Sequence, residues 1–226
     1  MEEHEVKDVE EQELDKRSQR NMIFVIVIIA LVVIGFIAFK AFHEPAPQTV
    51  DDVFQQALDG KLDEDVAYSY NGYVFVNIMG SWMTRIQVGN EMIEIPLHFG
   101  PRDLENNISI MGSVDNRFTS NPNLFITFDP NSTQMKYIAL SAAELSLSLA
   151  KGIKVNPVAA CTSNETACEG RPIVTCDSTN APVIYIKKDS DAMIVQSGNC
   201  VILSGNEWDL VRVVDRFLLA WYGIMP

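Results

Sequence analysis

The chain has 226 residues and a formal net charge of −13, from 17 Lys and Arg against 30 Asp and Glu. Nucleic acid and anionic lipid repel such a chain unless its basic residues cluster, so we expect no nucleic-acid partner. Apolar residues make up 47% of the composition and charged residues 21%, which excludes global disorder, and 12 Gly with 10 Pro exclude a collagenous protein.

The first element in the chain is an uncharged run rich in Ile and Val, Met22–Phe39. As a helix it covers roughly 27 Å, close to the hydrocarbon thickness of a bilayer. It is longer than the apolar part of a usual signal peptide, and no small-residue cleavage site follows it, which favours an uncleaved anchor. More Lys and Arg precede the run than follow it, which places the N-terminus in the cytoplasm and the rest of the chain across the cell membrane. We therefore predict an acidic cytoplasmic tail at 1–21, a transmembrane signal anchor at 22–42, a proline-containing linker at 43–49 and an extracytoplasmic domain at 50–226.

Residues 66–97 predict an antiparallel β-meander that follows a short helix over 50–59, which Thr49 is expected to cap. The turns are expected at Asn71-Gly72, Gly80-Ser81 and Gly89-Asn90, pairs typical of two-residue hairpin loops. The strands alternate apolar and polar residues, so one face of the meander is expected to be buried. Pro96 indicates an edge position or a strand end.

The part of the chain at 124–226 contains the cysteines, and its pattern predicts mixed α and β structure. A strand over 124–128, a helix over 136–150 ended by Gly152, and extended chain over 153–159 predict a βαβ unit with a parallel strand pair. The remaining expectations are a short strand at 108–111, short strands at 173–176 and 183–187, a hairpin of 192–196 with 200–204, and an amphipathic helix that begins after Asn206 and stops at Gly223. The fold class is therefore predicted to be α+β.

All four cysteines follow the apolar run, which agrees with an oxidising compartment and two disulfides. Four cysteines allow three pairings, of which we favour Cys161–Cys168, a local loop, and Cys176–Cys200, a link between neighbouring strands. Their spacing lacks the close pairs of a zinc site, and the chain has no phosphate-binding loop or nucleotide fingerprint, so no metal or cofactor is expected. Three N-x-S/T triplets in polar stretches are candidate glycosylation sites: Asn107, Asn131 and Asn164.

His98 is the one histidine inside the predicted folded region, so a Ser-His-Asp type of site would have to use it. Dense aromatic residues on the meander have two interpretations. They either form core and cross-strand pairs, or present an exposed face for a glycan or a protein partner. They are Tyr68, Tyr70, Tyr73, Phe75 and Trp82.

Three function classes fit these patterns. The first is a membrane-anchored, non-catalytic interaction or scaffolding protein whose partner is another envelope protein or a glycan. The second is an anchored hydrolase that assembles His98, Asp129 and nearby serines. The third is a pilin-like filament subunit, although Pro45 and Pro47 would interrupt its spine helix and the usual basic leader is missing.

The general layout resembles uncharacterised single-pass, signal-anchored surface proteins of archaea. The resemblance rests on Asn199-Cys200-Val201-Ile202, then Asp209-Leu210-Val211, and Asp215-Arg216 through Gly223-Ile224-Met225. It implies a surface location for the outer domain and no particular activity.

Overall fold

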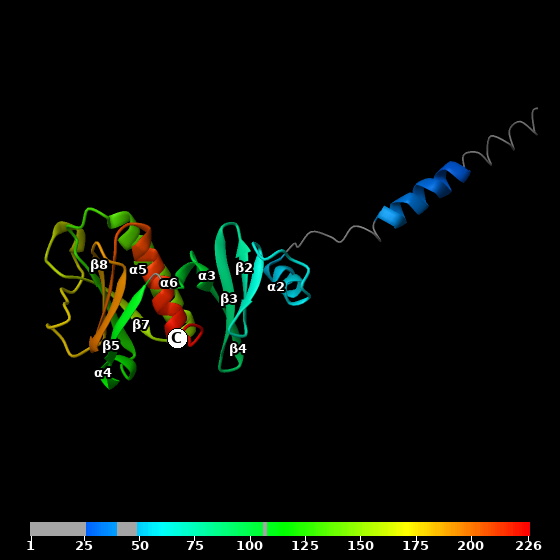
Figure 1. Cartoon of the computed structure of the whole chain (residues 1–226). Helices are drawn as coiled ribbons and strands as arrows, with labels where there is room; N and C mark the ends of the chain where they lie inside the picture. The colour runs from blue at the N-terminus through cyan, green and yellow to red at the C-terminus, as the bar shows by residue number, and fades with distance from the viewer. Residues whose placement is uncertain (1–25, 40–48, 106–107) are drawn as a thin grey trace, which may run out of the picture. The chain divides into compact units, whose positions relative to one another are not determined.

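The computed structural model describes residues 26–39, 49–105 and 108–226 (Figure 1). The chain divides into two units, Met1–Gln48 and Thr49–Pro226. Within the first unit, residues 26–39 form a helix whose side chains are all exposed. In the described ranges, no helix is both long enough and apolar enough to cross a membrane. The structure therefore does not support the predicted span Met22–Phe39. Residues 22–25 of that span, the predicted tail at 1–21, linker residues 43–48 and Asn107 lie outside the described residues.

The second unit begins with helix α2 (Val50–Leu58), which Thr49 caps as the sequence predicts. The Thr49 hydroxyl accepts a hydrogen bond from the Asp52 backbone N–H at 3.2 Å, and the Asp52 carboxylate accepts one from the Thr49 N–H at 3.1 Å. This reciprocal pair satisfies two backbone donors that the first helical turn leaves free. The buried side chain of Phe54 then packs α2 against Ala67 and Val76 of the meander.

The meander is confirmed as four antiparallel strands in sequential order, with bounds close to those predicted. They are β1 (Ala67–Tyr70), β2 (Tyr73–Ile78), β3 (Ser81–Val88) and β4 (Glu91–Leu97). Asn71 and Gly72 both have positive φ, at 46° and 84°, as a type I′ turn requires. The second turn was predicted one residue too late, because Met79 and Gly80 are its central residues, with φ of 53° and 84°. Pro96 lies on β4, an edge strand, as predicted.

A mixed six-stranded sheet forms the rest of the unit, in the order β5-β9-β10-β8-β6-β7. Its strands are β5 (Ser109–Val114), β6 (Asn123–Phe128), β7 (Asn156–Cys161), β8 (Val183–Lys188), β9 (Met193–Gly198) and β10 (Cys200–Gly205). The predicted parallel pair, β6 with β7, and the predicted hairpin, β9 with β10, are both confirmed. The strand expected at 173–176 is wrong, because only Ile173 makes an isolated bridge and the chain then turns, with the Thr175 N–H donating to the Ser178 hydroxyl.

Helices α5 (Met135–Ser148) and α6 (Trp208–Trp221) lie between the two sheets, and one hydrophobic core joins all of these elements (Figure 1). Helix α5 continues into a π-helical turn, Leu149–Ile153. Lys154 then takes the left-handed conformation, two residues after Gly152, where the sequence predicted the end of the helix. Gly152 serves another purpose, because a Cβ there would lie 2.6 Å from the hydroxyl of Tyr222. The α+β class is thus confirmed.

Short helices complete the connections between these elements. They are α3 (Pro101–Leu104), α4 (Asn116–Thr119) and a 3-10 turn at Thr166–Cys168. Helix α6 starts later than predicted, since Asn206 does not cap it and Glu207, with φ of 51°, occupies the N-cap position.

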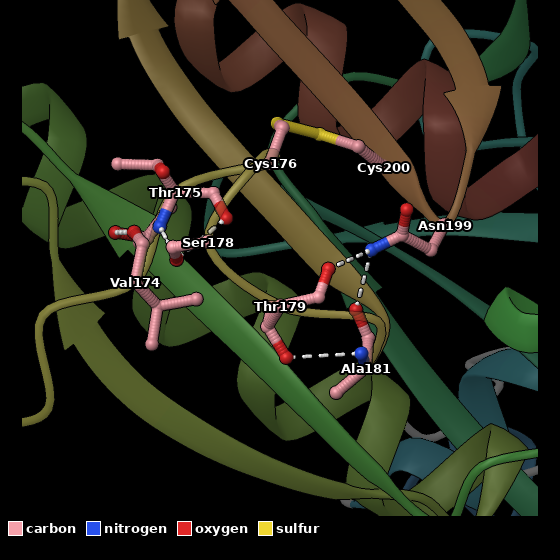
Figure 2. Close-up of a disulfide and its surroundings, with 9 residues drawn as sticks. Val174, Thr175, Cys176, Ser178, Thr179, Ala181, Asn199 and Cys200 are labelled. Atoms are coloured by element: carbon pink, nitrogen blue, oxygen red, sulfur yellow. Dashed lines mark hydrogen bonds between the residues drawn. A yellow bond between two sulfur atoms is a disulfide. The ribbon is translucent and has the colours of Figure 1, made fainter.

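The two disulfides are those favoured from the sequence, Cys161–Cys168 and Cys176–Cys200. The second joins a long loop to the first residue of β10, and Figure 2 shows how Asn199 reinforces that attachment. The Asn199 side-chain amide donates to the backbone carbonyl oxygens of Thr179 at 2.9 Å and of Ala181 at 2.8 Å. The loop is therefore fixed covalently and by hydrogen bonds to the same end of the sheet.

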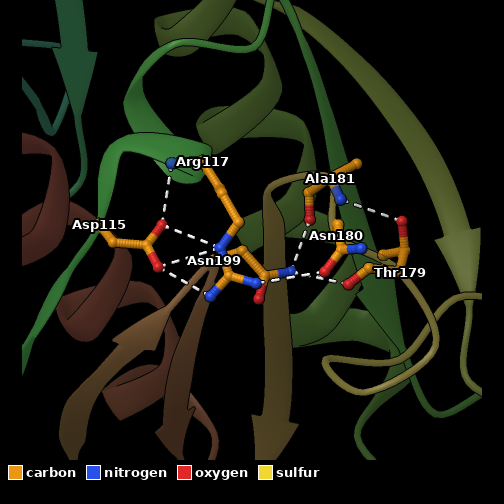
Figure 3. Close-up of polar contacts among 6 residues, drawn as sticks. All are labelled: Asp115, Arg117, Thr179, Asn180, Ala181 and Asn199. Atoms are coloured by element: carbon orange, nitrogen blue, oxygen red, sulfur yellow. Dashed lines mark hydrogen bonds and ion pairs between the residues drawn. The ribbon is translucent and has the colours of Figure 1, made fainter.

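Arg117 of α4 extends this polar network (Figure 3). Its guanidinium donates to both carboxylate oxygens of Asp115 and to the side-chain oxygen of Asn180 at 3.2 Å. The neighbouring guanidinium lowers the pKa of the Asp115 carboxyl. Because these partners occupy three of its nitrogen atoms, Arg117 holds the end of β5 against the loop.

Candidate functional site

Of the two interpretations of the meander aromatic residues, the structure agrees with core and cross-strand packing. Tyr68 and Phe75 are buried, and Tyr70, Tyr73 and Trp82 are half-buried against the same core. The Tyr68 ring stacks on Phe75 at 5.6 Å and meets the edge of Trp82 at 4.8 Å. Burial raises the pKa of Tyr68 to about 12. This side of the meander packs against the helices in one hydrophobic core.

His98, the histidine that the alternative hydrolase would have to use, contacts two buried carboxyl groups. Its Nδ1 lies 2.8 Å from the Oε2 of Glu144 on α5. The backbone N–H groups of His98 and Phe99 both donate to Oδ2 of Asp215 on α6, at 3.1 and 2.8 Å. The cluster therefore joins the end of β4 to both helices of the middle layer.

Asp215 holds its proton more tightly than an ordinary aspartic acid. Its side chain is fully buried, and burial, followed by the nearby Glu144 carboxyl, raises its pKa well above the usual value. Among the described residues no donor faces its second oxygen, Oδ1. Burial and the nearby Glu144 carboxyl therefore both disfavour a negative charge on Asp215.

This arrangement meets only part of what a hydrolase needs. Within the described ranges no serine is hydrogen-bonded to His98, and Asp129 accepts a hydrogen bond from the Asn131 N–H at 2.9 Å instead. His98 does not line any of three cavities formed by the described residues, which have volumes of about 760, 680 and 240 Å³. The cluster is better placed to join three elements than to receive a substrate.

A cluster of half-buried aromatic rings that the sequence did not predict surrounds the exposed Trp208, the first residue of α6. Trp208 is 41% exposed, and the rings of Tyr137, Phe99 and His98 lie 5.5, 6.1 and 6.1 Å from it. These residues come from three distant segments, so no local pattern could reveal them.

The largest of the three cavities lies where β2 and β3 separate. The two strands pair from Ile78 with Ser81 as far as Phe75 with Thr84, and no further. The buried Thr84 hydroxyl then donates to the carbonyl oxygen of Val74 at 2.9 Å and closes the paired region. Beyond it, the cavity of about 760 Å³ is lined on one side by Tyr73–Val74 of β2 and on the other by Arg85–Val88 of β3. We call this cavity the slot.

The slot has mostly apolar walls, to which Arg85 and Gln87 add polar groups, and an exposed apolar mouth. Phe54 and Leu58 of α2 line it, as do Tyr222 and Met92. Leu58 is 66% exposed and Met92 is 62% exposed, although both are large apolar side chains. An exposed apolar rim around a cavity is typical of a surface that binds another molecule.

Arg85 is the charged residue of the slot lining, and its charge is already matched. Its guanidinium donates to Glu94 through Nε at 3.2 Å and through Nη2 at 2.6 Å, and it also pairs with Asp51. Its flat face stacks on the Phe54 ring, with Cζ 4.1 Å from the centroid. Arg85 therefore fixes α2 to the meander and adds little net charge to the slot.

The two candidate glycosylation sites that the structure describes are exposed and lie in loops. They are neighbours, because the Asn131 side-chain amide donates to the carboxylate of Glu165, next to Asn164, at 3.2 Å. Their modification stays a prediction.

No protein-family model, curated protein or solved structure matches this chain.

Proposed function

We propose that this chain is a single-pass membrane protein whose residues 49–226 lie outside the cytoplasm and bind another envelope protein through the slot, without catalysis. The observation that carries the binding role is the slot itself, an apolar cavity with two exposed apolar side chains, Leu58 and Met92, at its mouth.

Two features support the location. The helix at 26–39 is apolar and exposes every side chain, which is unfavourable in water and favourable in a bilayer. Both disulfides lie in Thr49–Pro226, and disulfides persist in oxidising compartments.

The location is tested by adding protease to intact cells and to cells with opened membranes. We expect residues 49–226 to be reached in intact cells and the N-terminal tail to be reached only after the membrane is opened. Protection of residues 49–226 in intact cells would exclude the proposed orientation.

The binding role is tested with the purified full-length chain as bait in detergent-solubilised envelope. We expect a protein to be captured by the wild type and by Leu147→Glu, an exposed control on α5, and lost with Leu58→Glu. Capture of a glycan, or of a protein that Leu58→Glu retains, would contradict binding through the slot.

A membrane-anchored hydrolase is a second candidate, favoured by the 2.8 Å contact between His98 and Glu144. Turnover of small ester or peptide substrates that His98→Ala abolishes, with the unfolding midpoint unchanged, would replace the non-catalytic role.

A further inference from the structure

We infer that the slot takes an extended, uncharged apolar peptide segment of its partner, which adds as a strand to the free edge of β3. The inference rests on the proposed function and names the ligand class of the same site. It follows from the backbone of Arg85–Val88, the size of the slot and the chemistry of its walls.

The backbone of β3 has a free edge inside the slot. Arg85–Val88 pairs with β4, through Arg85 with Glu94 up to Val88 with Glu91. On its other side this stretch has no strand partner within the described ranges, because the pairing of β2 with β3 ends at Phe75 with Thr84. Unpaired backbone N–H and C=O groups along a strand edge form a template for another extended chain.

The other sheet edges carry features that discourage such pairing. Strand β1 has only four residues, β4 contains Pro96, and β7 contains Pro157. Strand β5 contains Gly112, which has a φ of 81°. Short strands, prolines and local irregularities are the means by which proteins protect edges. The free stretch of β3 contains neither proline nor glycine, so the edge in the slot differs from the outer edges of both sheets.

The slot has the size of a short strand. At roughly 3.3 Å per residue, the four residues of the free edge span about 13 Å. A cavity of about 760 Å³ lies in the range that binding sites for small ligands occupy. We therefore expect about four residues of the partner to enter the slot, with the flanking chain in solvent.

The walls define which side chains that segment carries. Side chains of a strand alternate between two faces, and here one face meets Phe54 and Leu58 of α2 while the other meets Tyr222. The walls are mostly apolar, Gln87 is an uncharged polar side chain, and Arg85 is already paired with Glu94 and Asp51. A charged side chain in the slot would lose its hydration without gaining a free partner, so both alternating sets are expected to be uncharged.

The test uses the full-length chain in nonionic detergent and a fluorescent, capped peptide with a central Val-Ile-Val-Thr flanked by lysines. The control peptide has the same side chains with N-methyl groups on all four central residues, which removes the backbone donors. We expect the parent peptide to bind, and the N-methylated peptide to bind at least about tenfold more weakly, since two or more hydrogen bonds are lost. The Leu58→Glu substitution is expected to weaken binding of the parent peptide by a similar factor, and Leu147→Glu is expected to leave that binding unchanged.

Equal binding of the two peptides would show that apolar contacts alone hold them, and would overturn strand addition. Absence of binding by either peptide would also overturn it. If neither peptide binds, yet envelope partner capture is lost with Leu58→Glu, the proposed function stands and the strand inference falls. If the wild type sediments as a dimer that Leu58→Glu dissociates, the occupant is a second copy of the chain and the inference is also overturned.

Discussion

Removing the disulfides one at a time should destabilise the fold by different amounts that their positions determine. Cys176 and Cys200 are 24 residues apart in the sequence, and Cys161 and Cys168 are 7 apart. On the chain-entropy model, a cross-link restricts the unfolded chain more when the closed loop is longer. With these separations, the model assigns about 3.5 kcal/mol to the long loop and about 2.4 kcal/mol to the short one. The measurement should compare the two variants, for which the expected difference is about 1.1 kcal/mol. Both variants lose cysteine side chains that are largely buried, and this common loss cancels in the difference.

The measurement is guanidinium unfolding of the full-length chain with each cysteine pair replaced by alanine. All three tryptophans lie in Thr49–Pro226, so their fluorescence reports on this unit. For a unit of this size, about 3.5 kcal/mol corresponds to a fall in Tm of roughly 7 to 14 °C. If the Cys161/Cys168 variant loses as much stability as the Cys176/Cys200 variant, loop closure does not govern the two contributions.

Two further substitutions test the buried carboxyl pair and the edge strand β5. Asp215→Asn should be at least as stable as the wild type at pH 7. The raised pKa of Asp215 means that the wild-type fold is favoured at low pH and loses stability as pH rises above about 4, the unfolded value, through the folded pKa. The urea midpoint of the variant should depend less on pH over this range than that of the wild type. A variant less stable than the wild type at pH 7 would mean that Asp215 is ionised beside Glu144. Gly112→Ala should destabilise the fold by more than Gly170→Ala, because both glycines have positive φ but only a Cβ at 112 would lie 2.0 Å from the Gln196 carbonyl oxygen. The control is expected to cost about 1 to 2 kcal/mol from backbone strain alone, and equal melting temperatures for the two variants would contradict the clash.

Local sequence patterns predicted those parts of the fold that depend on neighbouring residues. The turn at Asn71-Gly72, the cap at Thr49 and the parallel pair around α5 all follow from short-range rules for turns, caps and crossovers. The disulfide pairing was also predicted, since each disulfide joins two cysteines that are consecutive along the chain.

The candidate site could not be predicted in the same way. The slot exists because β2 and β3 separate after Thr84 and because α2 and Tyr222 lie on either side of the gap. Neither the point of separation nor these long-range contacts leaves a periodic signal in the sequence. The aromatic residues of the meander left two interpretations open for a related reason, because alternation shows that one face is buried but does not show which element covers it.

The capping box at Thr49 starts α2 at the first residue of the folded unit, and this has a mechanical consequence. Tension that reaches the unit along its N-terminal side is applied to α2 before it reaches any strand. The helix resists through the contacts of Phe54 and the ion pair between Asp51 and Arg85. Since α2 is also one wall of the slot, a pull strong enough to detach it would open the slot on that side.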